Sequence, residues 1–186
     1  MNATIETIAP ADANSDAAAP ALRVLVLDIY MDSHRVRGEL RYTGVGRRLV
    51  DILNSIEAGG HLALHNGRLE PLGREEPDSR VFGRLQVRRE AIILAVPSGD
   101  IPASPQPMEA VHKAPFPVTF VVPGYELSGN AYLLPDADPA LAPFLGSRHF
   151  IPMTDVTITA AQQGAPPREE PILLVNLART LFYAPR

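Results

Sequence analysis

The chain has 186 residues, a formal net charge of −4 at pH 7 and a hydrophobic content of 46%, which together are typical of a globular protein. It has no cysteine, so disulfide bonds, thiolate metal sites and thiol catalysis are excluded. No apolar run approaches the ~20 residues that a membrane-spanning helix needs, so no membrane span is expected.

Residues 1–21 are rich in alanine and contain several acids. They lack the basic and apolar regions that make a signal peptide. We therefore expect a disordered segment over residues 1–21 and a cytoplasmic location.

Two strands are predicted at the start of the ordered chain. Residues Arg23–Met31 are aliphatic and β-branched, which is typical of a buried strand. Residues His34–Thr43 alternate, with Val36 and Leu40 on one face and arginines on the other, as in a half-buried strand. Gly38 falls on the apolar face, so we expect a bulge or the close approach of another element there.

A short helix and a hairpin are predicted next. Apolar residues recur at helical spacing over Gly46–Ile56, which predicts an amphipathic helix of about three turns. The dipeptide Asn66-Gly67 indicates a hairpin turn. Residues Gly83–Val96 then form one long strand or a bent pair of strands.

The later part of the chain follows the same plan. Strands are predicted over residues 116–123 and 125–134, and a proline within residues 136–146 limits the helix there to one turn or a 3₁₀ turn. We interpret residues 154–155 as a turn between two further strands, and residues 171–184 complete the set. The predicted order is therefore β-β-α-β-β in each part.

Several sequence blocks occur twice in the same order, at offsets between 88 and 92 residues. The run Leu85–Pro97 aligns with Leu173–Pro185, and both runs end at a proline. The run His34–Tyr42 aligns with Tyr125–Leu133, which places a glycine at the same position of each block. Blocks repeated in a fixed order predict a duplicated module.

The duplication predicts four segments along the chain. These are the disordered segment 1–21, a first β-rich repeat over 22–97, a proline-rich linker over 98–115 and a second β-rich repeat over 116–186. Each repeat is close to the lower size limit for independent folding. We therefore expect the two repeats to pack together as a pseudo-twofold pair or to oligomerise.

The aligned blocks resemble a small uncharacterised bacterial domain with the signatures Arg-Leu-x-Asp-x-Leu-Asn and Phe-Ile-x-Leu-Thr-Asp-Val-x-Ile. The first repeat has RLVDILN at Arg48–Asn54, whereas the second has FIPMTDVTI at Phe150–Ile158 and LLVN at Leu173–Asn176. The resemblance implies a tandem pair of this domain. It implies no activity, substrate or catalytic residue.

Four polar residues are candidates for a binding cluster. Asp51 and Asn54 lie on the predicted helix, and Asp155 and Asn176 lie at predicted strand ends. These side chains either bind a ligand or form an interface, or they hydrogen-bond to backbone groups at helix ends and turns. We favour the second interpretation, because such caps are common.

Five arginines of the first repeat are candidates for an anion-binding face: Arg35, Arg37, Arg41, Arg84 and Arg88. If their strands were neighbours, the guanidinium groups would line one surface that binds phosphate, a nucleotide or nucleic acid. Glu39, Asp51 and Glu90 lie nearby in the sequence, the sequence pI is about 5.7, and there is no glycine-rich phosphate loop. We therefore favour a solvated face of mutual salt bridges.

The sequence gives little support for catalysis or metal binding. It contains no GxSxG motif, and the serine of Val96–Asp100 is interpreted as part of the linker turn. Its five histidines do not form a metal-binding motif, so no metal, cofactor or catalytic residue is predicted.

We therefore expect an α+β, mainly β protein of two homologous β-β-α-β-β modules, each a small barrel-like or open sheet. The favoured function is a non-enzymatic bacterial adaptor or assembly subunit, whose partner is another protein or a second copy of itself. The alternative is a regulatory module that binds a nucleotide or RNA through the arginine-rich face of the first repeat.

Overall fold

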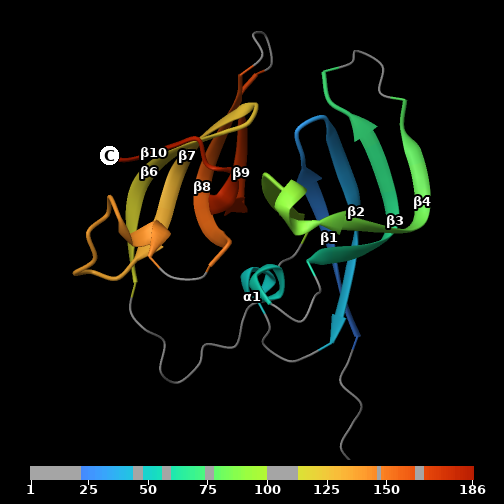
Figure 1. Cartoon of the computed structure of the whole chain (residues 1–186), viewed down its shortest axis with the longest axis horizontal. Helices are drawn as coiled ribbons and strands as arrows, with labels where there is room; N and C mark the ends of the chain where they lie inside the picture. Colours follow the sequence, from blue (N-terminus) through green and yellow to red (C-terminus); the bar gives the residue numbers. More distant parts are fainter. Residues whose placement is uncertain are drawn as a thin grey trace, which may run out of the picture.

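A computed structural model describes residues 22–43, 48–55, 60–73, 78–99, 113–145, 148–161 and 166–186. In these residues the chain is mostly β, and its strands form one antiparallel ten-stranded sheet in the order β10-β6-β7-β8-β9-β5-β1-β2-β3-β4 (Figure 1). The predicted mainly β character is confirmed. The sheet is continuous, however, where two separate sheets were expected.

The first half of the molecule extends from β1 to β5. Its elements are β1 (Leu22–Tyr30), β2 (His34–Thr43), helix α1 (Leu49–Asn54), β3 (His61–Pro71), β4 (Arg80–Arg88), the 3₁₀ turn η2 (Arg89–Ala91) and β5 (Leu94–Ser98). Of the two alternatives for Gly83–Val96, the bent pair of strands is confirmed, and it adds one strand to the β-β-α-β-β order. The segment bends at η2, and its two strands, β4 and β5, lie at opposite ends of the group β5-β1-β2-β3-β4.

The second half has the same order of elements. They are β6 (Ala114–Val122), β7 (Tyr125–Leu133), the 3₁₀ turn η3 (Ala142–Phe144), β8 (Phe150–Ala160), β9 (Arg168–Asn176), the 3₁₀ turn η4 (Leu177–Arg179) and β10 (Phe182–Pro185). A 3₁₀ turn thus replaces the helix, as the proline within this segment predicts.

Two predicted turns are wrong, because the strands run through them. Asn66-Gly67 lies inside β3 and Asp155 lies inside β8. Asn66 and Asp155 have φ values of +49° and +51°, and the register of each strand with its neighbour shifts at this point. A residue in the left-handed region inserts one extra position into a strand and produces a β-bulge, which keeps the ladder going where a hairpin would end it.

A glycine faces each bulge from the neighbouring strand. A Cβ atom at Gly38 would lie 3.2 Å from the Leu64 Cβ and 3.3 Å from the Gly67 Cα. A Cβ atom at Gly129 would lie 2.8 Å from the Thr154 carbonyl oxygen. The predicted close approach at Gly38 is therefore confirmed, and the second half contains the same arrangement.

Gly129→Ala is expected to lower the free energy of unfolding by about 1–3 kcal/mol, because the new methyl group overlaps the β8 backbone. Urea denaturation followed by far-UV circular dichroism measures the change. Gly83→Ala in β4 is the matched control, since its Cβ would meet nothing within 4 Å. A loss of stability that is equal in both variants would contradict this explanation.

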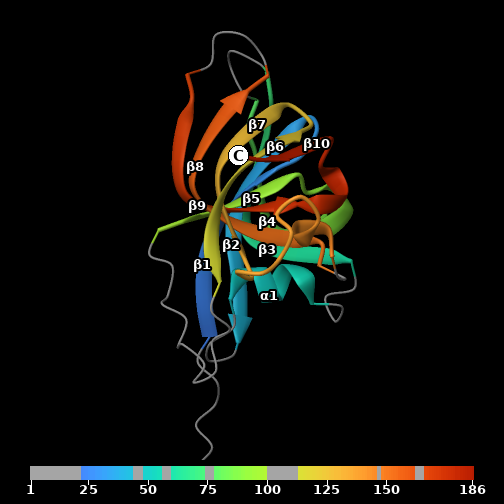
Figure 2. The ribbon, with the colours of Figure 1, turned by 90° about the vertical axis from the view of Figure 1, so that its left-hand side faces the viewer.

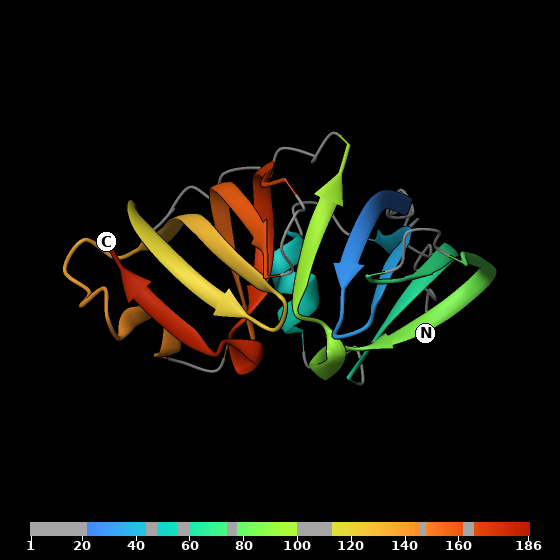
Figure 3. The same ribbon diagram turned by 90° about the horizontal axis from the view of Figure 1, so that it is seen from above.

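The described residues form one elongated unit in which the two halves lie side by side with α1 between them (Figure 3). Figure 2 views the second half end-on, with the first half behind it. The described residues contain no helix that is long and apolar enough to cross a membrane. The predicted segment 1–21 and most of the linker 98–115 lie outside the described residues.

Candidate interaction edges

The two halves are joined by a strand pair that we call the seam, in which β5 of the first half pairs with β9 of the second half. Leu94 is opposite Val175, and Ala95 is opposite Leu174. The Asn176 amide extends the pairing by donating to the Ile93 carbonyl at 3.0 Å. The predicted pseudo-twofold pair is not confirmed, since β5 and β9 occupy different positions in their halves.

Side chains cross the seam in both directions. Leu94 and Val96 of β5 pack in the core of the second half, whereas Leu174 of β9 and Phe150 of β8 pack in the core of the first half. All four are buried. Neither half therefore completes its core from its own residues alone.

Asn54 at the end of α1 ties the first half to the start of β8. Its Nδ2 donates to the Phe150 carbonyl at 2.9 Å, and its Oδ1 accepts from the backbone amides of His149 and Phe150 at 2.9 Å each. The same end of the helix is also held by Arg89 of the first half, whose guanidinium donates to the carbonyls of Ile52 and Ser55. Burial lowers the pKa of Arg89.

Asn176 at the end of β9 makes the second polar connection across the seam. Its Nδ2 donates to the Ile92 carbonyl at 2.8 Å and to the Arg89 carbonyl at 3.3 Å, and its Oδ1 accepts from the Ala178 amide at 3.0 Å. Asn54 and Asn176 thus bind backbone groups, as we favoured. All the backbone partners of Asn54 and the two carbonyls bound by Asn176 lie in the other half of the chain, so both residues also form an internal interface.

The other two polar candidates have local roles. Asp51 lies in the first turn of α1, where its Oδ2 accepts from the Arg48 amide at 3.3 Å. Asp155 was predicted at a strand end, and this is wrong, because it forms the bulge inside β8 and accepts from Asn130 at 3.2 Å. The structure therefore does not bring the four candidates together in one site.

The five arginines are divided between two strands that are not neighbours. Arg35, Arg37 and Arg41 lie on β2, whereas Arg84 and Arg88 lie on β4, and β3 separates the two strands. Four of these arginines are paired with carboxylates: Arg35 and Arg37 with Asp28, Arg41 with Glu39, and Arg88 with Glu90. This pairing favours the salt-bridged face over an anion-binding site.

Asp28 is a buried carboxylate that we did not single out from the sequence. It accepts from Arg35 and Arg37 at 2.9 Å each and from the Ser98 hydroxyl at 2.9 Å, so its charge is compensated. Burial lowers the pKa of Arg35, but the hydrogen bond that Arg35 donates to Asp28 and the neighbouring charges raise it by more. The sequence pattern that could have identified it is an aspartate within a run of mainly apolar residues, because a buried charge needs partners.

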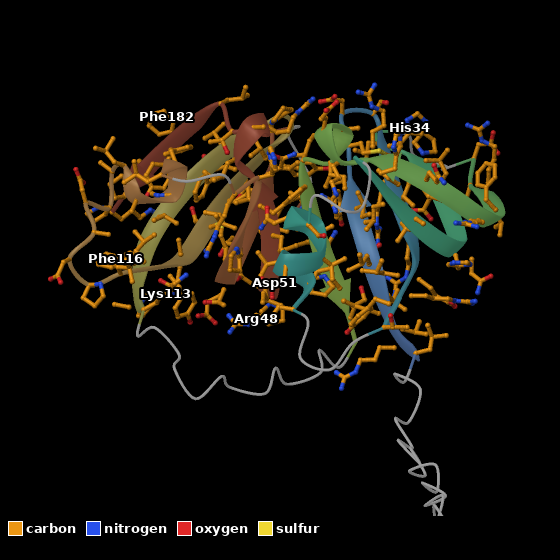
Figure 4. All side chains as sticks on the ribbon, turned by 60° about the horizontal axis from the view of Figure 1, so that its bottom comes forward. His34, Arg48, Asp51, Lys113, Phe116 and Phe182 are labelled. Atoms are coloured by element: carbon orange, nitrogen blue, oxygen red, sulfur yellow. The ribbon has the colours of Figure 1, made fainter. Side chains whose placement is uncertain are left out.

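The free edge of the second half is β10, which begins the sheet (Figure 1). Its hydrogen bonds match those of β5: the Leu181 amide donates to the Val121 carbonyl at 2.8 Å, just as Ile93 donates to Tyr30. Leu181 and Phe182 therefore correspond to Ile93 and Leu94. Leu181 is 70% exposed and Phe182 58% exposed, whereas Ile93 and Leu94 are 0% exposed. Figure 4 shows Phe182 at the outer rim of the second half.

The turn η3 adds further apolar surface beside β10. Leu141, Phe144 and Leu145 are all exposed, and the Phe144 ring contacts the Tyr183 ring of β10 with centroids 5.3 Å apart. We call these three residues together with Leu181 and Phe182 the β10 edge. In the first half, the element at the position of η3 is the helix α1, which contacts β8 across the seam.

The other end of the sheet is β4, which we call the β4 edge. Val81 and Phe82 are exposed on this strand, and Gln86 and Arg88 are exposed at its far end. Among the described residues, the two ends of the sheet are therefore both open strands that carry exposed apolar side chains.

Comparisons with known proteins return no match to a family model, to a curated protein or to a solved structure.

Proposed function

We propose that this chain is a non-enzymatic adaptor or assembly subunit that binds another protein through the β10 edge. We further propose that it is a tandem pair of one module. The shared order of elements supports the duplication, and so do the matching bulges and the matching hydrogen bonds at Ile93 and Leu181.

The observation that carries the proposed function is the contrast between β5 and β10. In the first half this strand is covered by β9, and its apolar side chains are fully buried. In the second half the corresponding strand ends the sheet with Leu181 and Phe182 in solvent. An open strand with apolar side chains is a template for pairing with another chain.

The arginine-rich face of the first half supports the alternative less well. Its guanidinium groups on β2 are already engaged by Asp28, Glu39 and Glu70. A phosphate would therefore compete with carboxylates that are held in place by the sheet, one of which is buried.

The proposal predicts that Leu181→Asp and Phe182→Asp abolish partner binding while the fold is retained, because both side chains are exposed. The measurement is affinity capture by the tagged full chain followed by light scattering of the eluted complex. Leu22→Asp is the matched control, since Leu22 is 62% exposed and lies on β1, away from β10.

We expect the control to retain the partner at the level of the unmodified chain. A chain that is strictly monomeric and retains no protein would contradict the proposed function. So would binding that survives both aspartate substitutions in β10.

A further inference from the structure

We propose that the β10 edge of one chain pairs with the β4 edge of a second copy, in the same arrangement by which β5 pairs with β9 inside each chain. This inference rests on the proposed function, because it names the occupant of the same edge. The seam is the model for this contact. Its strand β5 corresponds to β10 and its strand β9 corresponds to β4, and both β10 and β4 end the sheet unpaired on one side.

The side that contributes β5 has its counterpart at the β10 edge. Ile93 and Leu94 correspond to Leu181 and Phe182, and α1 corresponds to the segment around η3. In the first half Ile93 and Leu94 are buried, as is Leu53 of α1, and β5 and α1 contact β9 and β8. In the second half Leu181, Phe182 and the apolar residues around η3 are exposed. Both β10 and the η3 segment therefore lack the covering strands that β9 and β8 provide in the seam.

The side that contributes β9 has its counterpart at the β4 edge. Arg88 is opposite His61 at the start of β3, just as Asn176 is opposite Phe150 at the start of β8. Gln86 therefore corresponds to Leu174, and Val87 corresponds to Val175. The strand β4 ends the sheet, so its outer side is open to a second chain.

The two edges carry opposite charges at Arg84 and Asp138. Arg84 is exposed on β4, where Arg88 is exposed too but pairs with Glu90. On the β10 edge, the Tyr183 hydroxyl donates to the Pro139 carbonyl, which places the adjacent Asp138 beside β10. Arg88 lies at the position of Asn176, whose side-chain amide donates to the Arg89 and Ile92 carbonyls at the two ends of the η2 turn. The Arg88 guanidinium, which pairs with Glu90, has further N–H donors for the equivalent carbonyls. Its targets in a second copy would be the carbonyls of η4.

Two positions make the contact between copies weaker than the seam. Gln86 and His61 are polar and exposed where the seam has the buried side chains of Leu174 and Phe150. We therefore expect association that depends on concentration. Because the two paired edges differ, the contact is heterologous, and repeated copies form a ring or an open chain.

The first test restores a seam residue in the purified full chain. Gln86→Leu should lower the concentration for half-maximal association about tenfold, because it adds one buried leucine side chain to the contact. Sedimentation velocity over a range of concentrations measures the shift. An unchanged dissociation constant would overturn the head-to-tail arrangement, since Gln86 has no role in a contact between two β10 strands.

The second test blocks one edge at a time. Phe182→Asp disrupts the β10 edge, whereas Arg88→Pro removes the backbone N–H of residue 88. This N–H corresponds to the backbone N–H of Asn176, which donates to the Ile93 carbonyl in the seam. Arg88 has φ −65°, which a proline adopts without strain. Each variant alone should be monomeric, and their equimolar mixture should form a one-to-one dimer, because each supplies the edge that the other lacks.

Failure of this inference is distinct from failure of the proposed function. A mixture that stays monomeric overturns the pairing between copies. Self-association of Arg88→Pro at the level of the unmodified chain also overturns it, because the β4 edge would then have no part in the contact. If the purified chain is monomeric but captures another protein through Phe182, the proposed function stands and a second copy is excluded as the occupant.

Discussion

Phe150→Ala is expected to lower the free energy of unfolding by about 3–5 kcal/mol. Phe150 is fully buried, and although it belongs to β8 it packs in the core of the first half. The substitution leaves a cavity between the halves, and both lose contacts at once. Urea denaturation followed by far-UV circular dichroism measures the change, and we expect a single cooperative transition at a lower midpoint.

Phe116→Ala is the control for this substitution, because Phe116 is only half-buried at the margin of the second core. Phe116→Ala should lower the free energy of unfolding clearly less than Phe150→Ala does. Two separate transitions in the Phe150 variant, one of them at the original midpoint, would mean that the halves unfold independently. That result would contradict the sharing of cores across the seam.

Asn176→Ala is expected to lower the free energy of unfolding by about 2–4 kcal/mol, because it removes hydrogen bonds from a buried site and leaves backbone groups without partners. The Asn176 side chain is the donor to the Ile92 carbonyl and the acceptor from the Ala178 amide. Thermal and urea denaturation both measure the loss. We expect the m-value to stay constant, since the folded structure is otherwise retained.

Asn130→Ala is the matched control for the asparagine. Asn130 makes one exposed hydrogen bond to Asp155, so its loss should cost about 1 kcal/mol or less. If both asparagine variants lost the same stability, the connection through Asn176 would not contribute to the seam as described.

The strands of this fold could be predicted because their residues alternate or form short apolar runs. Arg23–Met31 and His34–Thr43 were expected as strands, and both are strands to within one or two residues. The bulges could not be predicted in the same way. Asn66-Gly67 favours φ above zero, and this conformation serves a hairpin turn and a bulge equally well. Only the pairing of β3 with both neighbours decides between them.

The seam could be predicted only in part. Asn54 and Asn176 could be singled out by their place after apolar runs, but their partners are 96 and 84 residues away in the chain. No local pattern identifies contacts at such separation. The same holds for Phe182, because an apolar residue in a strand has the same sequence pattern whether the strand is covered, as at Leu94, or open.

The exchange of side chains across the seam has a consequence for synthesis on the ribosome. The whole first half emerges before Phe150 and Leu174 have been translated, so its core lacks two of its buried residues during that time. We therefore expect the nascent first half to remain loosely packed and accessible to chaperones until β8 and β9 follow. Folding that depends on contacts between such distant residues is slow. Both halves thus become stable together only after β8 and β9 have emerged.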